Sequence, residues 1–319
     1  MVKPGGPMNA MGKVWEATGM LMVLVVLLLI LSVAVPGFVS LLNIKGLLRS
    51  VSTVGMIACT MLFCLAAGDF DLSVGSVVAM SGVLCAVVIN ATGSVLIGMV
   101  AGVLAGGVVG VFNGFVIAQL GINALITTLA TMEIVRGFAF IVCGGVTVGV
   151  RVSSFYALGS GHPFGIQMPI LLMIAAFIVF GVLLNRTVFG RNTLAIGGNA
   201  EAARLAGVPV VRTKIIIFTL QGMMAGFAGV VLASQLTSGQ PNNGLGLELQ
   251  VISACVLGGV SLTGGIGTML GVVTGVLIMG SVDNAMSMRN IPDFWQLVTR
   301  GSILLAAVLI DRFKQVRSK

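Results

Sequence analysis

Residues 94–118 read SVLIGMVAGVLAGGVVGVFNGFVIA and contain no charged side chain. A helix needs about 20 apolar residues to cross the hydrocarbon core of a bilayer. Including this run, the sequence contains ten apolar stretches of about this length. They cover residues 19–36, 48–67, 72–92, 94–118, 122–143, 169–185, 212–236, 248–262, 264–287 and 292–311. The sequence therefore predicts an all-α, polytopic membrane protein of about ten transmembrane helices.

The overall composition agrees with a protein that is surrounded by lipid. The chain has 319 residues, of which 57% are hydrophobic and only 8% are charged. A soluble domain carries about 25% charged residues, because its surface must face water. The chain also contains 45 glycines, embedded in apolar runs. Membrane helices tolerate glycine and use it to bring backbones close together, so we expect membrane lipid as the main surroundings.

Five glycines recur every fourth residue within the run quoted above, so they lie on one face of a helix. They are Gly98, Gly102, Gly106, Gly110 and Gly114. A stripe of small residues at this spacing predicts close packing against a neighbouring helix. A shorter glycine run occurs in the ninth predicted span. An Asn lies at or after the end of each run, at Asn113 and Asn284, and an Arg-Gly pair lies further on. This pattern indicates a possible internal repeat, in which spans two to five correspond to spans seven to ten.

The basic residues predict the orientation in the membrane. With both termini in the cytoplasm, the cytoplasmic segments and their flanks hold eleven of the seventeen Lys and Arg residues, as the positive-inside rule requires. The net charge of +8 is then explained by topology, and no nucleic-acid partner is needed. The resulting organisation is a cytoplasmic tail over 1–18, a transmembrane domain over 19–311 with a cytoplasmic loop at 186–211, and a basic tail over 312–319.

The cytoplasmic loop contains a predicted short helix at about residues 200–206. Asn199 is a suitable N-cap, Glu201 adds negative charge to the first turn, and Gly207 followed by Pro209 ends the helix. A helix this short is unstable alone, so it needs a surface to dock against. An ordinary basic loop is the alternative interpretation.

Carboxylates and amides within or between the predicted spans are candidates for a pathway or gate, because charge is costly inside a membrane. Asp69 and Asp71 lie at a predicted helix junction, where they could form a gate or hinge, or simply cap the next helix. Glu133 could pair with Arg136 three residues later. Glu248 is a further inward-facing candidate.

Uncharged polar residues supply a second set of candidates. A low-affinity sugar passage could be lined by Asn113, Asn123, Thr127, Thr131 and Asn284. The alternative for each of them is a hydrogen bond between helices.

Several kinds of site are missing from the sequence. It has no GxxxxGK[ST] motif, so this chain should not bind and hydrolyse ATP itself. It also shows no Cys/His, Ser/His or metal-ligand pattern, so we predict no catalytic, cofactor-binding or metal-binding residues and no enzyme activity. Energy for transport must come from another protein or from an ion gradient.

The residues around the loop resemble a known family. The segment GGNAEAARLAGVPVVRTK (197–214) is similar to the cytoplasmic coupling loop of permeases from ribose, arabinose and xylose ATP-binding-cassette importers. The similarity extends over nearly the whole chain from about residue 15, and is greatest to the L-arabinose permeases. Four further segments carry it: LAAGDFDLSVGSVVAMSGV (65–83), INALITTLATMEIVRG (122–137), TSGQP (237–241) and VISACVLGGVSLTGGIG (251–267).

This resemblance implies a channel-forming permease subunit in a bacterial inner membrane that imports a monosaccharide, such as L-arabinose or a related pentose. It implies three partners: a second permease copy, a cytoplasmic ATPase and a periplasmic sugar-binding protein. The ATPase would dock on the loop residues Asn199, Glu201, Ala203, Arg204 and Gly207. The alternatives are a secondary transporter driven by an ion gradient, for which the carboxylates would be suited, and a membrane scaffold that transports nothing.

Overall fold

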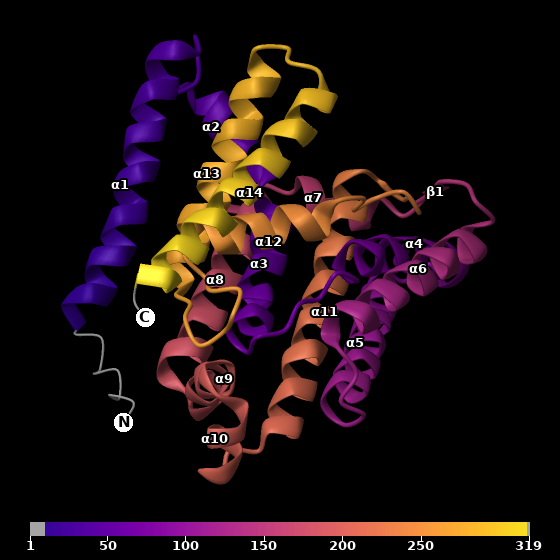
Figure 1. Cartoon of the computed structure of the whole chain (residues 1–319). Coiled ribbons are helices and arrows are strands. Elements are labelled where there is room, and N and C mark those ends of the chain that lie inside the picture. The colour runs from indigo at the N-terminus through magenta and orange to yellow at the C-terminus, as the bar shows by residue number, and fades with distance from the viewer. Residues whose placement is uncertain (1–9, 318–319) are drawn as a thin grey trace, which may run out of the picture.

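The structure, a computed structural model, describes residues 10–317, which form fourteen α-helices, two short 3-10 helices and two short strands. The long helices are α1 (Ala10–Ala34), α4 (Val74–Thr92), α5 (Val95–Ala118), α6 (Ala124–Cys143), α8 (Met168–Arg186), α11 (Val210–Gln235), α13 (Met269–Met288) and α14 (Asp293–Arg317). The shorter elements are α2 (Leu41–Ser50), α3 (Ser52–Ala66), β1 (Val148–Gly149), η1 (Ser153–Tyr156), α7 (Ala157–Ser160), η2 (Pro163–Gly165), α9 (Val188–Gly198), α10 (Ala200–Leu205), β2 (Ser238–Gly239) and α12 (Leu247–Leu257). Figure 1 shows their arrangement.

The predicted number of ten spans is wrong, although the chain is a polytopic all-α protein. Within residues 19–309, where the structure describes the side chains, six helices are long and apolar enough to cross a membrane. They are α4, α5, α6, α8, α11 and α13. A seventh span is obtained only if α2 and α3, which meet at a bend of 45°, are counted together.

Glycine turns and charged residues explain the difference. The eighth predicted span contains only the eleven residues of α12, because the chain turns at Gly259, whose φ is +85°. The described apolar part of α1, Gly19–Ala34, is also short, and the described part of α14 carries the charged residues Asp293 and Arg300. Apolar composition continues through such turns, so a count from composition overestimates the spans. The predicted repeat of spans two to five as spans seven to ten is wrong as well, because α12, which replaces the eighth span, is not a full span.

The helix α3 lies at the centre of the molecule (Figure 1). Every one of its fifteen residues is buried, and it is surrounded by α8, α11, α12 and α13. A helix that is hydrophobic on all sides is stable only when other helices cover it. In contrast, α1 exposes apolar side chains such as Met22 and Val33, as a helix facing lipid would.

The glycine stripe of α5 packs against α11 and α4. A Cβ atom on Gly106 would lie 2.2 Å from the carbonyl oxygen of Gly222, and one on Gly222 would lie 2.2 Å from that of Gly106. Gly110 is equally close to the carbonyl oxygen of Phe218 in α11. The two backbones are therefore in direct contact, and no side chain fits between them.

The two long loops lie at opposite ends of α8. Before α8, β1 pairs antiparallel with β2, so that Val148 faces Gly239. The side chain of Asn90 supports this pair by donating a hydrogen bond to the carbonyl of Gly149, at 2.8 Å. After α8 come α9 and α10, at the lower end of Figure 1. Of the predicted tails, residues 10–18 continue α1 and 312–317 continue α14, while 1–9 and 318–319 lie outside the described residues.

Candidate functional site

The loop between α8 and α11 forms two short helices with well-defined ends. The Asn199 side chain accepts a hydrogen bond of 2.9 Å from the backbone N–H of Ala202, as an N-cap does. At the other end of α10, Val208 N–H bonds to Ala203 and Gly207 N–H bonds to Arg204, each at 3.0 Å. These two bonds, with a φ of +86° at Gly207, form a Schellman motif. The structure therefore contains the predicted helix, ending at Leu205.

The outer face of α10 is polar and exposed. Glu201 and Arg204 form an ion pair of 2.6 Å, and about two thirds of each side chain remains accessible, at 64% and 65%. The hydrogen bond from Arg204 lowers the pKa of Glu201. Leu205 is 78% exposed beside them, whereas Ala203 is buried on the inner face. Next to α10 an open groove of about 490 Å³ runs past Pro209 toward Ile216.

The preceding helix, α9, lies directly on the core. A Cβ atom on Gly197 would lie 1.8 Å from the carbonyl oxygen of Ala66, at the end of α3. That same carbonyl accepts a hydrogen bond of 2.9 Å from Gly265, in the turn before α13. Phe189 stacks on Phe63 of α3, with ring centroids 5.7 Å apart. Three segments far apart in sequence therefore meet beneath α10.

One ion pair joins this region to the turn between α3 and α4. The Lys214 amine, in α11, lies 2.7 Å from a carboxylate oxygen of Asp69. Only 18% and 12% of these side chains are exposed. Burial raises the pKa of Asp69, and Lys214 opposes that rise. Asp69 is thus tied to the helix that follows α10.

Asp71 begins a buried hydrogen-bond network. Its carboxylate accepts bonds from the backbone N–H of Ser73, at 2.9 Å, and from the Ser73 hydroxyl, at 2.6 Å. Burial raises the pKa of Asp71 to about 6, although these bonds oppose the rise. The Ser73 hydroxyl in turn accepts from Asn113, at 3.0 Å, and Thr131 lies 2.8 Å from the Asn113 oxygen. The structure therefore brings together Asp71, Asn113 and Thr131, three of the predicted polar residues.

The remaining predicted amides bond within or between helices elsewhere. Asn123 caps α6 through bonds to the backbone of Leu125 and Ile126, and its carbonyl accepts from Thr127. Asn284 of α13 exchanges two hydrogen bonds with Asn43 of α2, at 2.9 and 3.0 Å. The Asn284–Asn43 contact is therefore a hydrogen bond between helices, whereas the bonds of Asn123 and Thr127 stay within α6 and its cap.

The carboxylates Glu133 and Glu248 are accessible. Glu133 is exposed on α6, and no ion pair with Arg136 is found among the described residues. Arg136 instead donates to the carbonyls of Pro241 and Asn243, at 2.6 and 2.7 Å. Glu248 is half-buried and close enough to Arg136 for an electrostatic interaction.

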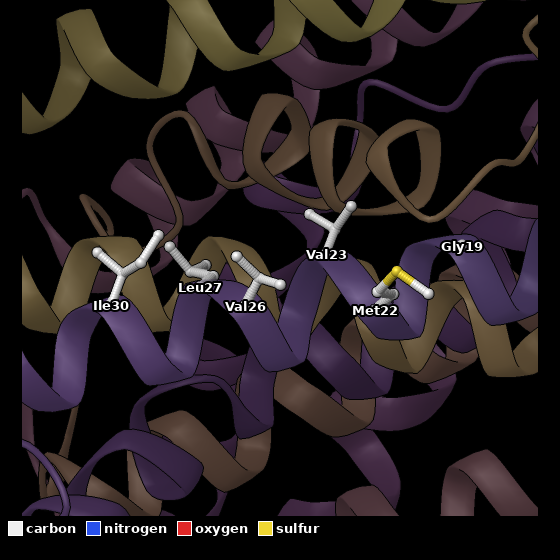
Figure 2. Close-up of a pocket in the computed structure, with 6 residues that line it drawn as sticks. All are labelled: Gly19, Met22, Val23, Val26, Leu27 and Ile30. Atoms are coloured by element: carbon white, nitrogen blue, oxygen red, sulfur yellow. The ribbon is translucent and has the colours of Figure 1, made fainter.

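A second groove, of about 380 Å³, runs along α1 and is lined by apolar residues (Figure 2). Met22, Val26 and Ile30 point into it, and their side chains offer no hydrogen-bonding group to a sugar. This groove is typical of a surface that faces lipid.

Sequence reasoning missed Lys214 and Ser73. Lys214 was counted only as a basic flank of the cytoplasmic loop, because its partner Asp69 is far away along the chain. Ser73 lies next to the acidic pair, but its bond to Asn113 depends on how α4 and α5 pack. A lysine near the start of an apolar helix is the one sequence signal that could have suggested a buried carboxylate partner.

Comparison with known proteins gives one consistent result. Residues 43–308 match the family model described as "Branched-chain amino acid transport system / permease component". The chain is 62% identical over 304 residues to the L-arabinose transport system permease protein AraH of Escherichia coli (strain K12), covering 95% of this chain and 93% of that protein. It is 55% identical to the L-arabinose ABC transporter permease protein AraH of Azospirillum brasilense, over 97% and 92% of the two chains.

A more distant relative is the ribose import permease protein RbsC of Bacillus subtilis (strain 168). It is 41% identical over 303 residues, which cover 94% of each chain. No solved structure matches the chain.

Proposed function

The chain belongs to this family of transport-system permease components, and we propose that it forms the membrane pathway of an ATP-driven importer for L-arabinose or a related pentose. The sugar is proposed from the names of the two most similar relatives cited above, which are L-arabinose permeases. Two copies of the chain would enclose the pathway, and a periplasmic binding protein would deliver the sugar to it.

The observation that carries this proposal is the geometry of α10. A helix of six residues has little stability of its own, yet it is capped at both ends and held on the core by α9. Its outer face carries an exposed ion pair and an exposed leucine. The apolar groove beside α10, lined by residues that include Val208 and Ile216, extends this surface, and a contiguous apolar patch rimmed by charges is typical of a protein-docking surface. We assign this surface to a cytoplasmic ATPase, because the chain has no phosphate-binding loop of its own.

The orientation follows from the basic residues of the same region. Arg186, Arg191, Arg204, Arg212 and Lys214 all lie in or next to the α9–α10 segment. The positive-inside rule therefore favours a cytoplasmic position for this end. Both termini would share that side, and the transmembrane domain would extend over 19–311 with its coupling loop at 186–211.

The candidate pathway residues take two different roles in this proposal. Glu133 and Glu248 are accessible, so they are our candidates for the walls between the two copies. Asn113, Asn123 and Asn284 are engaged in bonds within the molecule, and we assign them to holding helices in place. Asp69 and Asp71 lie on the α10 side, where a gate would respond to the ATPase.

The test is to remove the charges of α10 while keeping its helix. Glu201→Ala with Arg204→Ala preserves helix propensity, so folding should be unaffected. We expect the affinity for the partner ATPase to fall about tenfold, equivalent to about 1.4 kcal/mol. Arg151→Ala, an exposed arginine in the loop before α8, is the control in the binding assay and should leave ATPase affinity unchanged.

Transport in reconstituted vesicles gives the second readout. Uptake by the wild-type protein with its ATPase and binding protein should require ATP and should persist with an uncoupler. Uptake that persists without ATP and collapses with the uncoupler would contradict the proposal. Unchanged ATPase affinity in the double alanine variant would contradict the docking role of α10.

A further inference from the structure

We propose that the Lys214–Asp69 ion pair and the hydrogen bonds that begin at Asp71 transmit the movement of α10 to α5 and α6. This inference rests on the proposed function, since it needs an ATPase docked on α10. We call the six residues involved the coupling network. They are Lys214, Asp69, Asp71, Ser73, Asn113 and Thr131.

The first step runs from α10 to Lys214. The Schellman bonds fix the end of α10, and Pro209 restricts the short link that follows. The Thr213 hydroxyl bonds back to the Pro209 carbonyl, at 2.9 Å, so the link and the first turn of α11 form one unit. Lys214 is the next residue. A displacement of α10 therefore carries the backbone of Lys214 with it.

The second step is the ion pair itself. Separating the two groups of a buried ion pair would leave both charges uncompensated. The two groups therefore have to move together. The backbone of Asp69 is also fixed to the end of α3, because its N–H bonds to Cys64 at 3.0 Å. Two residues further on, Asp71 holds both the N–H and the hydroxyl of Ser73. The short turn between α3 and α4 therefore follows Lys214 as one piece.

The third step crosses from this turn to α5 and α6. Asn113 uses both ends of its amide, donating to Ser73 and facing the Thr131 hydroxyl. Asn113 is fully buried, and Ser73 and Thr131 are at most 4% exposed, so water offers no substitute partner.

Thr131 provides an element with two states. Its hydroxyl oxygen lies 2.8 Å from the Asn113 oxygen and 2.6 Å from the Thr127 carbonyl, but a hydroxyl has one hydrogen to donate. A shift of α6 relative to α5 can therefore exchange one acceptor for the other without leaving the hydroxyl unbonded. Such a bistable contact is what transmission between sites requires.

A second ion pair provides a matched control. Asp283 and Arg300 are 3.0 Å apart, with 15% and 31% of their side chains exposed. Gln250 also bonds to Asp283, at 3.1 Å, so this group joins α12, α13 and α14. The pair resembles Lys214–Asp69 in length and burial but has no member in the segment around α10.

The experiment compares two double variants in reconstituted vesicles with the ATPase and the binding protein. Asp69→Asn with Lys214→Gln removes both charges of the coupling pair, and Asp283→Asn with Arg300→Gln removes both charges of the control pair. We expect the first variant to bind the ATPase and hydrolyse ATP normally, while sugar moved per ATP falls about tenfold. The control variant should keep the wild-type ratio.

The outcomes separate this inference from the proposed function. If the wild-type protein neither binds an ATPase nor uses ATP, the proposed function fails. If the wild-type protein couples normally and the Asp69/Lys214 variant keeps its ratio, the coupling network is wrong. A fall in the control variant equal to that in the coupling variant would also overturn it.

A third variant tests the coupling network even if the Asp69/Lys214 variant fails to fold. Thr131→Val replaces one hydroxyl by a methyl group of similar size and removes the final bond of the network, to Asn113, together with the alternative bond to Thr127. We expect sugar per ATP to fall about threefold with unchanged ATPase binding, since this bond is one part of the coupling. An unchanged ratio in Thr131→Val would overturn the proposed two-state contact.

Discussion

The α5–α11 interface and the α9–α10 segment both depend on glycine, but they use it for opposite purposes. In the interface, Gly106 and Gly222 bring two long helices into backbone contact deep within the molecule. In the α9–α10 segment, Gly197 presses a short helix against the end of α3, and α10 beyond it exposes its charged face. The first arrangement makes one rigid body of two helices. The second arrangement supports α10 on the core through α9 and leaves the charged face of α10 exposed.

This difference indicates that α5 and α11 form a rigid part of the molecule, whereas the α9–α10 segment can move. Backbones that touch have no rotamers to rearrange, so the α5–α11 pair should move as a unit. The α9–α10 segment is held by the Gly197 contact, the stacking of Phe189 on Phe63 and two caps, and the Lys214–Asp69 ion pair lies just beyond it. Four predictions test this contrast, from the largest expected effect to the smallest.

The largest effect should come from Gly106→Ala, which acts on the rigid side of the contrast. The added Cβ would lie 2.2 Å from the Gly222 carbonyl oxygen, so α5 and α11 must separate. Overpacking of this kind costs about 3 kcal/mol. Thermal unfolding in detergent measures it, and Gly137→Ala is the control because nothing lies within 4 Å of that position. Equal stability of the two variants would show that the interface is not rigid.

A smaller loss is expected from Gly197→Ala, in the α9–α10 segment. The new Cβ would lie 1.8 Å from the Ala66 carbonyl oxygen, but a short helix at the surface can move away. We expect a loss of about 2 kcal/mol in stability together with weaker ATPase binding. The neighbouring change Gly198→Ala has nothing within 4 Å and should preserve both properties. If Gly198→Ala were equally damaging, contact with α3 would not be the cause.

Asn199→Ala should act locally on α10. It removes the side chain that accepts from Ala202 N–H, at a cost of about 1 kcal/mol. Hydrogen exchange of the amides in residues 200–207 should become faster, while α5 and α11 should be unaffected. Asn199→Asp keeps a capping oxygen and should retain wild-type exchange. Faster exchange throughout the molecule would remove the distinction between the two regions.

The smallest effect on stability concerns Asp71, and it is visible mainly as pH dependence. With a folded pKa of about 6, above its value in the unfolded chain, the native state binds the proton more tightly. This contribution to stability is fully present at low pH and is lost as pH rises from about 4 to 6.

Asp71→Asn removes the titration. The amide oxygen can still accept from Ser73. Loss of the buried charge is favourable near pH 7, whereas the unpartnered N–H₂ group is unfavourable, so the two effects oppose each other and the net change should stay below about 1 kcal/mol. We expect the wild type to gain stability relative to this variant when pH is lowered from 7 to 5. Parallel unfolding curves at the two pH values would contradict the assignment.

Much of the α9–α10 segment could be predicted because its signals are local. The N-cap Asn199 and the C-terminal Gly207 act on residues within a few positions of themselves. The glycine stripe of α5 is local as well, since spacing alone fixes one helical face. The number of spans was wrong because α12 ends at a glycine turn inside an apolar stretch.

The sequence by itself determined that this protein is a bundle of membrane helices with a short capped helix between two of them, because composition and capping are properties of neighbouring residues. Only the tertiary structure decided which distant groups meet. It joined Lys214 to Asp69, placed Asn113 between Ser73 and Thr131, and directed Arg136 to two carbonyls rather than to Glu133. Such pairings depend on how helices pack, and packing is set by contacts between segments that the order of residues does not bring together.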